Sequence, residues 1–206
     1  MIKAAILVGG RGKRMGKEKA MLKVCGKIFL EKITETLKGY EIVVVCRDLE
    51  QVKEYKKAFS LNCPFIEDTV KDFGPLAGIH AALNYFKDYV VVIAVDLPLI
   101  KRDVVSTIYH ECVKMQADAL IPAKGDKFEP LLACYSYNAV KEIEKSFERG
   151  ERKILIPISR LKNVIFYDIE NLRKVDKDLI SFFNINTKED LQRVEELCSL
   201  TDLGGK

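Results

Sequence analysis

The chain has 206 residues, of which 48% are hydrophobic and 31% charged, with a mean hydropathy of −0.02. It is long enough to bury a full core, too apolar to be intrinsically disordered, and lacks the run of roughly 18 apolar residues that spans a bilayer. Its 34 basic and 30 acidic residues leave a net charge of +4, too small by itself to indicate nucleic-acid binding. We therefore expect a cytoplasmic, monomeric protein that binds neither membranes nor nucleic acids.

Strand and helix patterns alternate along the whole chain. Apolar, β-branched runs predict strands at 4–8, 42–46, 64–66, 89–95, 119–123, 131–135 and 164–169. Helical periodicity predicts helices at 28–38, 49–59, 76–87, 101–116, 136–148 and 187–198. Several strands are apolar without alternation, as buried parallel strands are. The pattern predicts an α/β fold with a single doubly wound, mostly parallel sheet and helices on both faces, a Rossmann-like arrangement.

This pattern has no linker, so we expect one domain over residues 1–198 and a frayed tail at 199–206. The six cysteines stand at least 17 residues apart, without the close pairs of zinc or redox motifs. Most lie in apolar stretches, and we expect all six to be buried free thiols.

A glycine-rich, basic segment, LVGGRGKRMGKEKAML at 7–22, follows the first predicted strand. Its glycines let the backbone approach a ligand closely, and its N–H groups can cradle phosphate oxygens. The spacing is not that of a Walker A loop, because Glu18 follows Gly16-Lys17, nor that of the dinucleotide fingerprint, because three residues separate Gly12 from Gly16. Five cations favour a triphosphate ligand: Arg11, Lys13, Arg14, Lys17 and Lys19.

The long apolar run at 90–100 delivers Asp96 to the carboxyl end of a strand, and Leu97-Pro98 ends that strand. A carboxylate facing a triphosphate loop is suited to Mg²⁺, which takes one or two carboxylates together with phosphate oxygens and water. The simpler interpretation is that Asp96 only caps the following turn.

The segment FIEDTVKDFGPLAGIHAAL at 65–83 contains a loop and the start of a helix. The glycines Gly74 and Gly78 allow a base or ribose to approach, and Asp68 can accept hydrogen bonds from a purine edge or a ribose. Taken alone, the pattern is equally typical of an ordinary helix start.

Two later segments carry polar groups. Three cations stand within Arg149-Gly150-Glu151-Arg152-Lys153, although such runs are most often solvated. In FFNINTKED, Asn184 and Asn186 would point to the same side of a strand and suit a polar heterocycle, and Thr187 is a candidate N-cap for the last helix.

Five segments occur along the chain in this order: LVGGRGKRMGKEK, ED with GPLAGI, DLP, GERK and FNINT. With these segments the chain resembles the molybdenum cofactor guanylyltransferases over residues 2 to about 196. This resemblance implies a nucleotidyltransferase fold and transfer of GMP from GTP to the terminal phosphate of molybdopterin, with release of pyrophosphate. It implies Mg²⁺ as cofactor and other proteins of the cofactor pathway as possible partners. It also implies a nucleotide-binding half over 1–100 and an acceptor-binding half over 101–198.

Site residues follow from the same resemblance. Arg14, Lys19 and Asp96 would be catalytic, and Asp96 would also bind the metal. The nucleotide-binding positions would be Leu7, Val8, Gly9, Gly10, Lys19, Asp68, Gly74, Gly78 and Asp96, and the acceptor-binding positions Arg152, Asn184 and Asn186. The sequence departs from the family at Val8, where alanine is usual, and at Cys46, where asparagine is frequent.

Three alternatives remain open. An adenosylcobinamide-phosphate guanylyltransferase shares the first loop and the FNINTKED segment, but GPLAGI and GERK argue against it. A cytidylyltransferase that acts on a sugar or alditol phosphate is a second nucleotidyltransferase. Outside this class, a GTP-binding module without catalysis remains possible, whereas a nicotinamide oxidoreductase would need the dinucleotide spacing.

Overall fold

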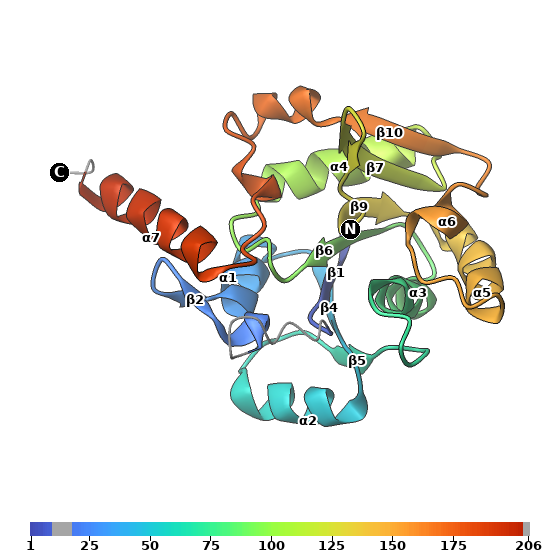
Figure 1. Cartoon of the computed structure of the whole chain (residues 1–206), viewed down its shortest axis with the longest axis horizontal. Helices are drawn as coiled ribbons and strands as arrows, with labels where there is room; N and C mark the ends of the chain where they lie inside the picture. Colours follow the sequence, from blue (N-terminus) through green and yellow to red (C-terminus); the bar gives the residue numbers. More distant parts are fainter. Residues whose placement is uncertain (10–17, 204–206) are drawn as a thin grey trace.

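Eight strands form the central sheet of the computed structural model, which describes residues 1–9 and 18–203 (Figure 1). From one edge to the other they are β10 (Val164–Asp168), β7 (Ala119–Lys124), β9 (Leu132–Tyr135), β6 (Val90–Ala94), β1 (Lys3–Leu7), β4 (Glu41–Cys46) and β5 (Phe65–Glu67), with β8 (Lys127–Phe128) paired to β7. Strand β9 runs antiparallel to both β6 and β7, and β8 is antiparallel to β7, whereas the other pairs are parallel. The prediction of a mostly parallel α/β sheet is confirmed.

Strand β1 lies at the centre of the parallel part of the sheet. Leu7, near its carboxyl end, pairs with Val45 of β4 on one side and with Ala94 of β6 on the other. The three strands therefore end level with one another. The loops that follow them open at the same edge, which is where ligands bind in open α/β sheets.

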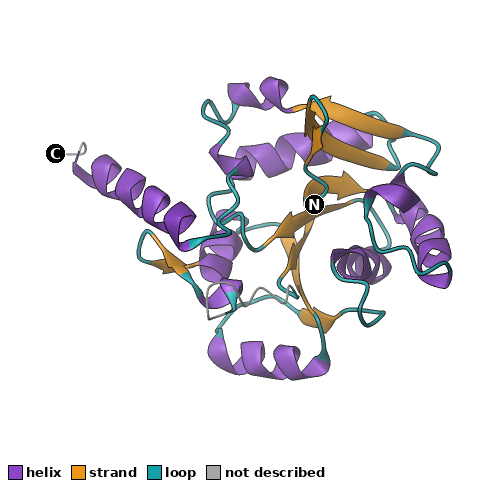
Figure 2. Cartoon of the chain, in the orientation of Figure 1, coloured by secondary structure: helices purple, strands orange, loops and turns teal. Residues whose placement is uncertain are grey.

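Helices cover both faces of the sheet (Figure 2). Alternate residues of β1 point to different cores: Ala4 and Ile6 lie in one core, and Ala5 lies in the other. The first core is closed by α1 (Phe29–Thr36), α2 (Leu49–Ala58) and α4 (Arg102–Lys114), and the second by α3 (Pro75–Phe86), α5 (Val140–Glu148) and α6 (Leu155–Ile158). This two-sided cover is the doubly wound arrangement that the sequence predicts.

Local sequence signals account for the starts of several helices. Asp48 caps α2 by accepting a 2.8 Å hydrogen bond from the backbone N–H of Gln51. Helix α7 (Lys188–Leu203) has a reciprocal cap, in which Thr187 accepts from the Asp190 N–H and Asp190 accepts from the Thr187 N–H. The predicted role of Thr187 as N-cap is confirmed.

Short elements and two boundaries differ from the prediction. Unpredicted are η2 (Lys19–Met21), β2 (Lys23–Val24), β3 (Lys27–Ile28), β8, α6, η4 (Ile169–Lys174) and η5 (Ile180–Phe182). The helix expected at 136–148 begins with a short 3-10 turn, η3 (Tyr137–Ala139), and continues as α5. Asn184 and Asn186, expected on a strand, lie outside the sheet, and the Ile185 N–H between them donates to the carbonyl of Asp96 beyond the end of β6. Helix α7 continues to Leu203, past the expected end at 198, because residues 199–203 include no glycine or proline that would end it.

The prediction that all six cysteines are free thiols is wrong for two of them. Cys25 and Cys198, 173 residues apart, form a disulfide between the β2–β3 hairpin and α7. The backbone N–H of Cys25 also donates a 2.9 Å hydrogen bond to Glu195 of α7. The pairing depends on how α7, which extends away from the sheet, lies against the hairpin (Figure 1), and sequence spacing does not reveal such a contact. Cys46, Cys63, Cys112 and Cys134 are free.

In the part of the chain that the structure describes, none of the helices is both long and apolar enough to cross a bilayer.

The disulfide predicts a specific thiol count. Alkylation of the denatured, unreduced protein is expected to modify four cysteines, and prior reduction is expected to raise this to six, as mass spectrometry would show. Because a disulfide limits the freedom of the unfolded chain, replacing Cys25 and Cys198 together by serine is expected to lower the free energy of unfolding by about 2–4 kcal/mol. Cys63→Ser is the matched control, and six alkylated thiols without reduction would contradict the pairing.

Candidate active site

The loops at the carboxyl edge of the sheet hold the predicted site together. The N–H of Val8 donates to Val45 at 3.0 Å, and the N–H of Asp68 donates to Cys46 at 2.7 Å. On the other side of β1, the N–H of Val95 donates to Leu7 at 3.2 Å. These bonds extend the ladders beyond the strand ends, so the backbone at Val8, Asp68 and Asp96 is fixed on one edge.

Lys19 joins two other predicted site residues. Its Nζ donates to Oδ2 of Asp96 at 2.9 Å and to Oδ1 of Asn186 at 2.6 Å. The side chains of Lys19 and Asp96 are each about one-fifth exposed, so the ion pair is largely shielded. The N–H of Ile185 also donates to the Asp96 carbonyl at 2.9 Å. Asn186, predicted to bind the acceptor, therefore lies beside the predicted phosphate-binding lysine.

The second carboxylate oxygen of Asp96 is suited to a metal ion. Oδ1 is buried and accepts no hydrogen bond from any residue that the structure describes. A buried, unpartnered carboxylate oxygen is costly unless a donor or cation occupies its lone pairs. Mg²⁺ is a hard cation that binds through one or two carboxylates and substrate phosphates. Asp96 therefore fits the implied Mg²⁺ through Oδ1, while Lys19 occupies Oδ2.

Asp68 packs closely against α3. A Cβ atom placed on Gly78 would lie 3.3 Å from Oδ1 of Asp68 and 3.1 Å from Cδ2 of Leu7, so glycine allows α3 to approach both residues. Gly74 precedes α3 with a φ of +57°, a conformation that favours glycine. Burial, and secondarily the negative charge of Asp48, raises the pKa of Asp68 to about 7.

A network on α2 anchors both ends of the glycine-rich segment. The amide of Gln51, a fully buried side chain, donates to the Val8 carbonyl at 3.4 Å and to Glu18 at 3.2 Å. Tyr55 donates to the same carboxylate oxygen at 2.5 Å, and Arg47 donates to the other one at 2.6 Å. Gly10 and Arg14, predicted site residues, lie outside the described residues.

Sequence analysis did not identify this network. Its signal was weak but present: Gln51 and Tyr55 are four residues apart, on one face of a helix that is otherwise rich in charge. Burial opposes ionisation of Glu18, but the hydrogen bonds from Tyr55, Arg47 and Gln51 outweigh it and lower the pKa of this carboxyl group. A charged Glu18 is thus held next to Lys19, and it fixes the backbone from which the Lys19 side chain extends.

Arg152 lines a pocket rather than the Lys19 centre. An open pocket of about 580 Å³ is bordered by Pro75, Pro130, Arg152, Lys153, Ile154, Leu155, Ile156 and Ser159. The Arg152 guanidinium lies 5.8 Å from the centre of the Phe73 ring, which packs edge-on against Phe147 at 4.7 Å. Asn184 is half-buried, and no hydrogen bond links it to Arg152. Asn186 thus contacts Lys19, whereas Arg152 borders this pocket.

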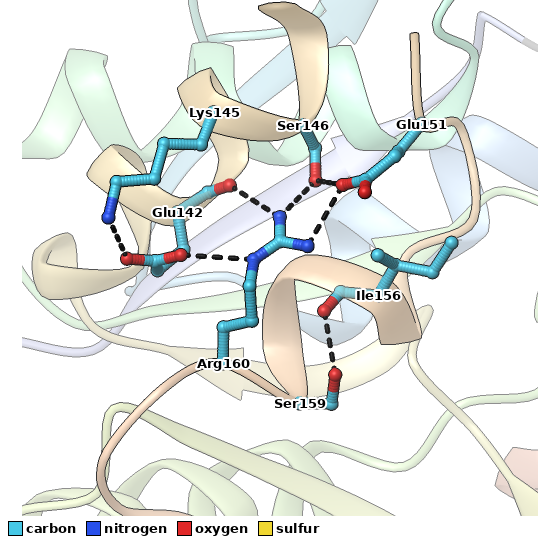
Figure 3. A network of polar contacts seen from close by, with 7 residues as sticks. All are labelled: Glu142, Lys145, Ser146, Glu151, Ile156, Ser159 and Arg160. Carbon is cyan, nitrogen blue, oxygen red and sulfur yellow. Dashed lines mark hydrogen bonds and ion pairs between the residues drawn. The ribbon is translucent and has the colours of Figure 1, made fainter. Parts of the chain in front are cut away.

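A second network holds the loop that carries Arg152 (Figure 3). Arg160 donates to Glu142 at 3.1 Å and to Glu151 at 2.9 Å, and Ser146 donates to Glu151 at 2.7 Å. These contacts tie α5 to the segment after α6 and hold the carboxylate of Glu151, the residue that precedes Arg152. Arg160 was not predicted, because it lies outside every motif of the sequence.

Comparison with known proteins identifies the family of this chain. A family model described as the MobA-like NTP transferase domain matches residues 4–164. The chain belongs to this family.

MobA-like relatives extend the match over almost the whole chain. Probable molybdenum cofactor guanylyltransferases of Methanosarcina mazei and Clostridium perfringens strain 13 are 36% and 34% identical over 200 and 201 residues. These alignments cover 93% and 94% of this chain and 88% and 98% of the relatives. The crystal structure of molybdopterin-guanine dinucleotide biosynthesis protein A from Archaeoglobus fulgidus has a TM-score of 0.89 and 47% identity, covering 97% of this chain and 100% of that one. The predicted family and fold are confirmed.

The α2 network predicts a pH-dependent loss of stability in Tyr55→Phe. The variant lacks a hydrogen bond to a charged group and is expected to lose about 2 kcal/mol of unfolding free energy at neutral pH. A carboxyl whose pKa is lowered by folding stabilises the protein above its unfolded pKa and loses this contribution as the pH falls through the folded pKa. The difference from the unmodified protein should therefore shrink in acid.

Urea unfolding at neutral pH and near pH 4, about the ordinary pKa of glutamate, would measure this difference. Tyr85→Phe is the control, because that side chain is 47% exposed. An equal loss for both variants, or a loss that does not change with pH, would argue against the network.

Proposed function

We propose that this chain transfers GMP from GTP to the terminal phosphate of molybdopterin, forming the guanine dinucleotide cofactor and pyrophosphate. The observation that carries the proposal is the contact of Lys19 with Asp96 and Asn186 where the glycine-rich segment ends, in a chain of the MobA-like family. The names of its relatives support this acceptor. Adenosylcobinamide phosphate is not favoured, and neither is binding of GTP without catalysis.

The nucleotide would lie along the carboxyl edge of β1. The resemblance assigns backbone contacts with the nucleotide to Leu7, Val8 and Gly9. Gly9 packs so closely against the loop after β4 that an added Cβ would lie 3.2 Å from the backbone nitrogen of Arg47. The guanine base presents N–H donors, and the ionised carboxylate of Asp68 is an acceptor that matches them. Burial raises the pKa of the Cys46 thiol to about 12, so this side chain is neutral and selection of guanine rests on Asp68.

The reaction requires two anions to meet. The terminal phosphate of the acceptor has a second pKa of about 6 and is largely a dianion at neutral pH. One of its oxygens attacks the α-phosphorus of GTP, a new P–O bond forms, and the bond to the β-phosphate oxygen breaks to release pyrophosphate. Lys19 reduces the repulsion between the phosphates, and the resemblance assigns the same role to Arg14. Bound Mg²⁺ supplies further charge neutralisation through Asp96.

The acceptor would occupy the pocket beside Arg152. Pro75 begins α3 and also borders this pocket, so the helix that packs against Asp68 also borders the acceptor. Arg152 and Lys153 supply positive charge, and the surrounding apolar side chains suit a flat ring system. The placement of Asp68 at the nucleotide and of Arg152 at the acceptor pocket supports a nucleotide-binding half over 1–100 and an acceptor-binding half over 101–198.

Pyrophosphate release tests the proposal. GTP, ATP, CTP and UTP are each supplied with Mg²⁺ and with molybdopterin or adenosylcobinamide phosphate, and release is expected only with GTP and molybdopterin. Asp96→Asn is expected to reduce turnover at least about a hundredfold, because an interaction made to the reacting phosphates is lost. Asp103→Asn, at the start of α4, is the control. Release with the cobinamide acceptor, or none despite GTP binding, would overturn the proposed function.

Asp68 predicts a pH dependence of GTP binding. With a pKa of about 7, its carboxyl group is mostly protonated near pH 6 and mostly ionised near pH 8. Because only the ionised form accepts hydrogen bonds from both guanine donors, the KM for GTP is expected to fall roughly tenfold over this interval. Asp68→Asn should raise KM and flatten the profile. An equally steep profile in Asp68→Asn would assign the effect to the phosphates of GTP instead.

A further inference from the structure

His80 is a polar residue buried in α3. It is 8% exposed, and its neighbours in the helix, Ile79 and Ala81, belong to the hydrophobic core on this face of the sheet. A buried imidazole is costly unless its ring nitrogens find hydrogen-bonding partners. Two segments outside α3 supply these partners: the loop that follows β5 and helix α5.

The ring of His80 joins Thr69 to α5. Its Nδ1 lies 2.7 Å from the Thr69 hydroxyl, and its Nε2 lies 3.3 Å from a carboxylate oxygen of Glu144. Because a carboxylate only accepts hydrogen bonds, Nε2 carries a proton, and in the neutral ring Nδ1 accepts from Thr69. The amide nitrogen of Asn84, one turn further along α3, lies 3.3 Å from Nδ1 and 3.1 Å from Nε2 and donates to the His80 carbonyl, so it favours neither tautomer.

Both ends of the loop between β5 and α3, residues 68–74, are attached to His80. Near the start of the loop, the Thr69 hydroxyl contacts the His80 ring directly. Near its end, the Phe73 ring packs edge-on against Phe147 of α5, with ring centres 4.7 Å apart. Phe147 in turn packs edge-on against the His80 ring at 5.2 Å. One buried ring therefore supports the loop on both sides.

This loop carries groups that the proposed reaction needs for each substrate. Asp68, which would select guanine, begins the loop, and its N–H donates to the Cys46 carbonyl at 2.7 Å. The Phe73 ring lies 5.8 Å from the guanidinium of Arg152, which borders the acceptor pocket. Pro75, directly after the loop, borders the same pocket. A displacement of the loop would therefore disturb the nucleotide and acceptor positions together.

We propose that His80 is a positioning residue, which holds the loop at 68–74 in the conformation that presents Asp68 to the nucleotide. The inference rests on the proposed function and deepens it. His80 acts through Thr69 and Phe147 and takes no part in the transfer itself. Because Asp68 would contact the base rather than the reacting phosphates, loosening the loop weakens binding in the ground state and the transition state alike. The KM for GTP then rises while kcat is retained.

Removal of the Thr69 hydroxyl tests the proposal in the full-length protein. Thr69→Val keeps the shape of the side chain but cannot donate to His80. It is expected to raise the KM for GTP, and the Kd for GTP measured by calorimetry without acceptor, about fivefold, with kcat within about twofold of wild type. Thr69→Ser keeps the hydroxyl and should retain the wild-type values. Thr107→Val, which removes a hydroxyl that donates within α4, is the matched control. Unchanged GTP affinity in Thr69→Val, or an equal loss in Thr69→Ser, would overturn the proposal.

His80→Phe is the second variant, because its ring can still pack against Phe147 but accepts no hydrogen bond. In the double variant with Thr69→Val, the loss of GTP affinity is expected to be no larger than in His80→Phe alone, since both changes break the same contact. Additive losses would mean that Thr69 acts independently of His80 and would overturn the proposal.

Hydrogen–deuterium exchange of the ligand-free protein provides a readout that does not depend on activity. Peptides that cover residues 68–74 should exchange faster in Thr69→Val and His80→Phe than in Thr69→Ser or Thr107→Val. Equal exchange in all four variants would overturn the proposal. A failed transfer assay with the exchange and affinity differences intact would overturn the proposed function while supporting the role of His80. Absence of GTP binding by the wild-type protein would overturn both.

Discussion

The ion pair between Lys19 and Asp96 is the contact on which the arrangement of the site depends. A carboxylate at the end of a buried strand is costly unless it is compensated, and the Lys19 ammonium group compensates one of its two oxygens. The same ammonium group binds Asn186, which is 167 residues away along the chain. The other residues at this carboxyl edge of the sheet position these groups. The second oxygen of Asp96, Oδ1, accepts no hydrogen bond from the described residues and is suited to a metal ion.

Two polar networks hold the backbone on either side of these groups. Gln51 contacts both described ends of the glycine-rich segment, and Glu18 is bound by Tyr55 and Arg47, so the backbone before Lys19 is fixed. On the other side of the molecule, Arg160 holds Glu151 and with it the loop that carries Arg152 (Figure 3). Long cationic side chains lose considerable conformational entropy when ordered, and a rigid backbone reduces that cost.

Helix α3 relates the two halves of the site. Gly78 packs against Leu7 and Asp68, whereas Pro75 borders the pocket beside Arg152. The antiparallel strand β9 adds a second link, because it pairs with β6 and follows Pro130, which borders the same pocket. A reaction between two anionic substrates requires their phosphates to meet at a defined point. Helix α3 and the antiparallel strand β9 together define that point.

The sequence alone determined the sheet, the order of its main strands and helices, and the positions of Lys19, Asp68 and Asp96 near its carboxyl edge. These follow from local information: apolar runs, helical periodicity, caps such as Thr187, and glycines near strand ends. Only the tertiary structure decided the Cys25–Cys198 disulfide, the contact of Asn186 with Lys19, and the roles of Gln51 and Arg160. Each of these depends on which distant segments pack together, and no local pattern of residues encodes that choice.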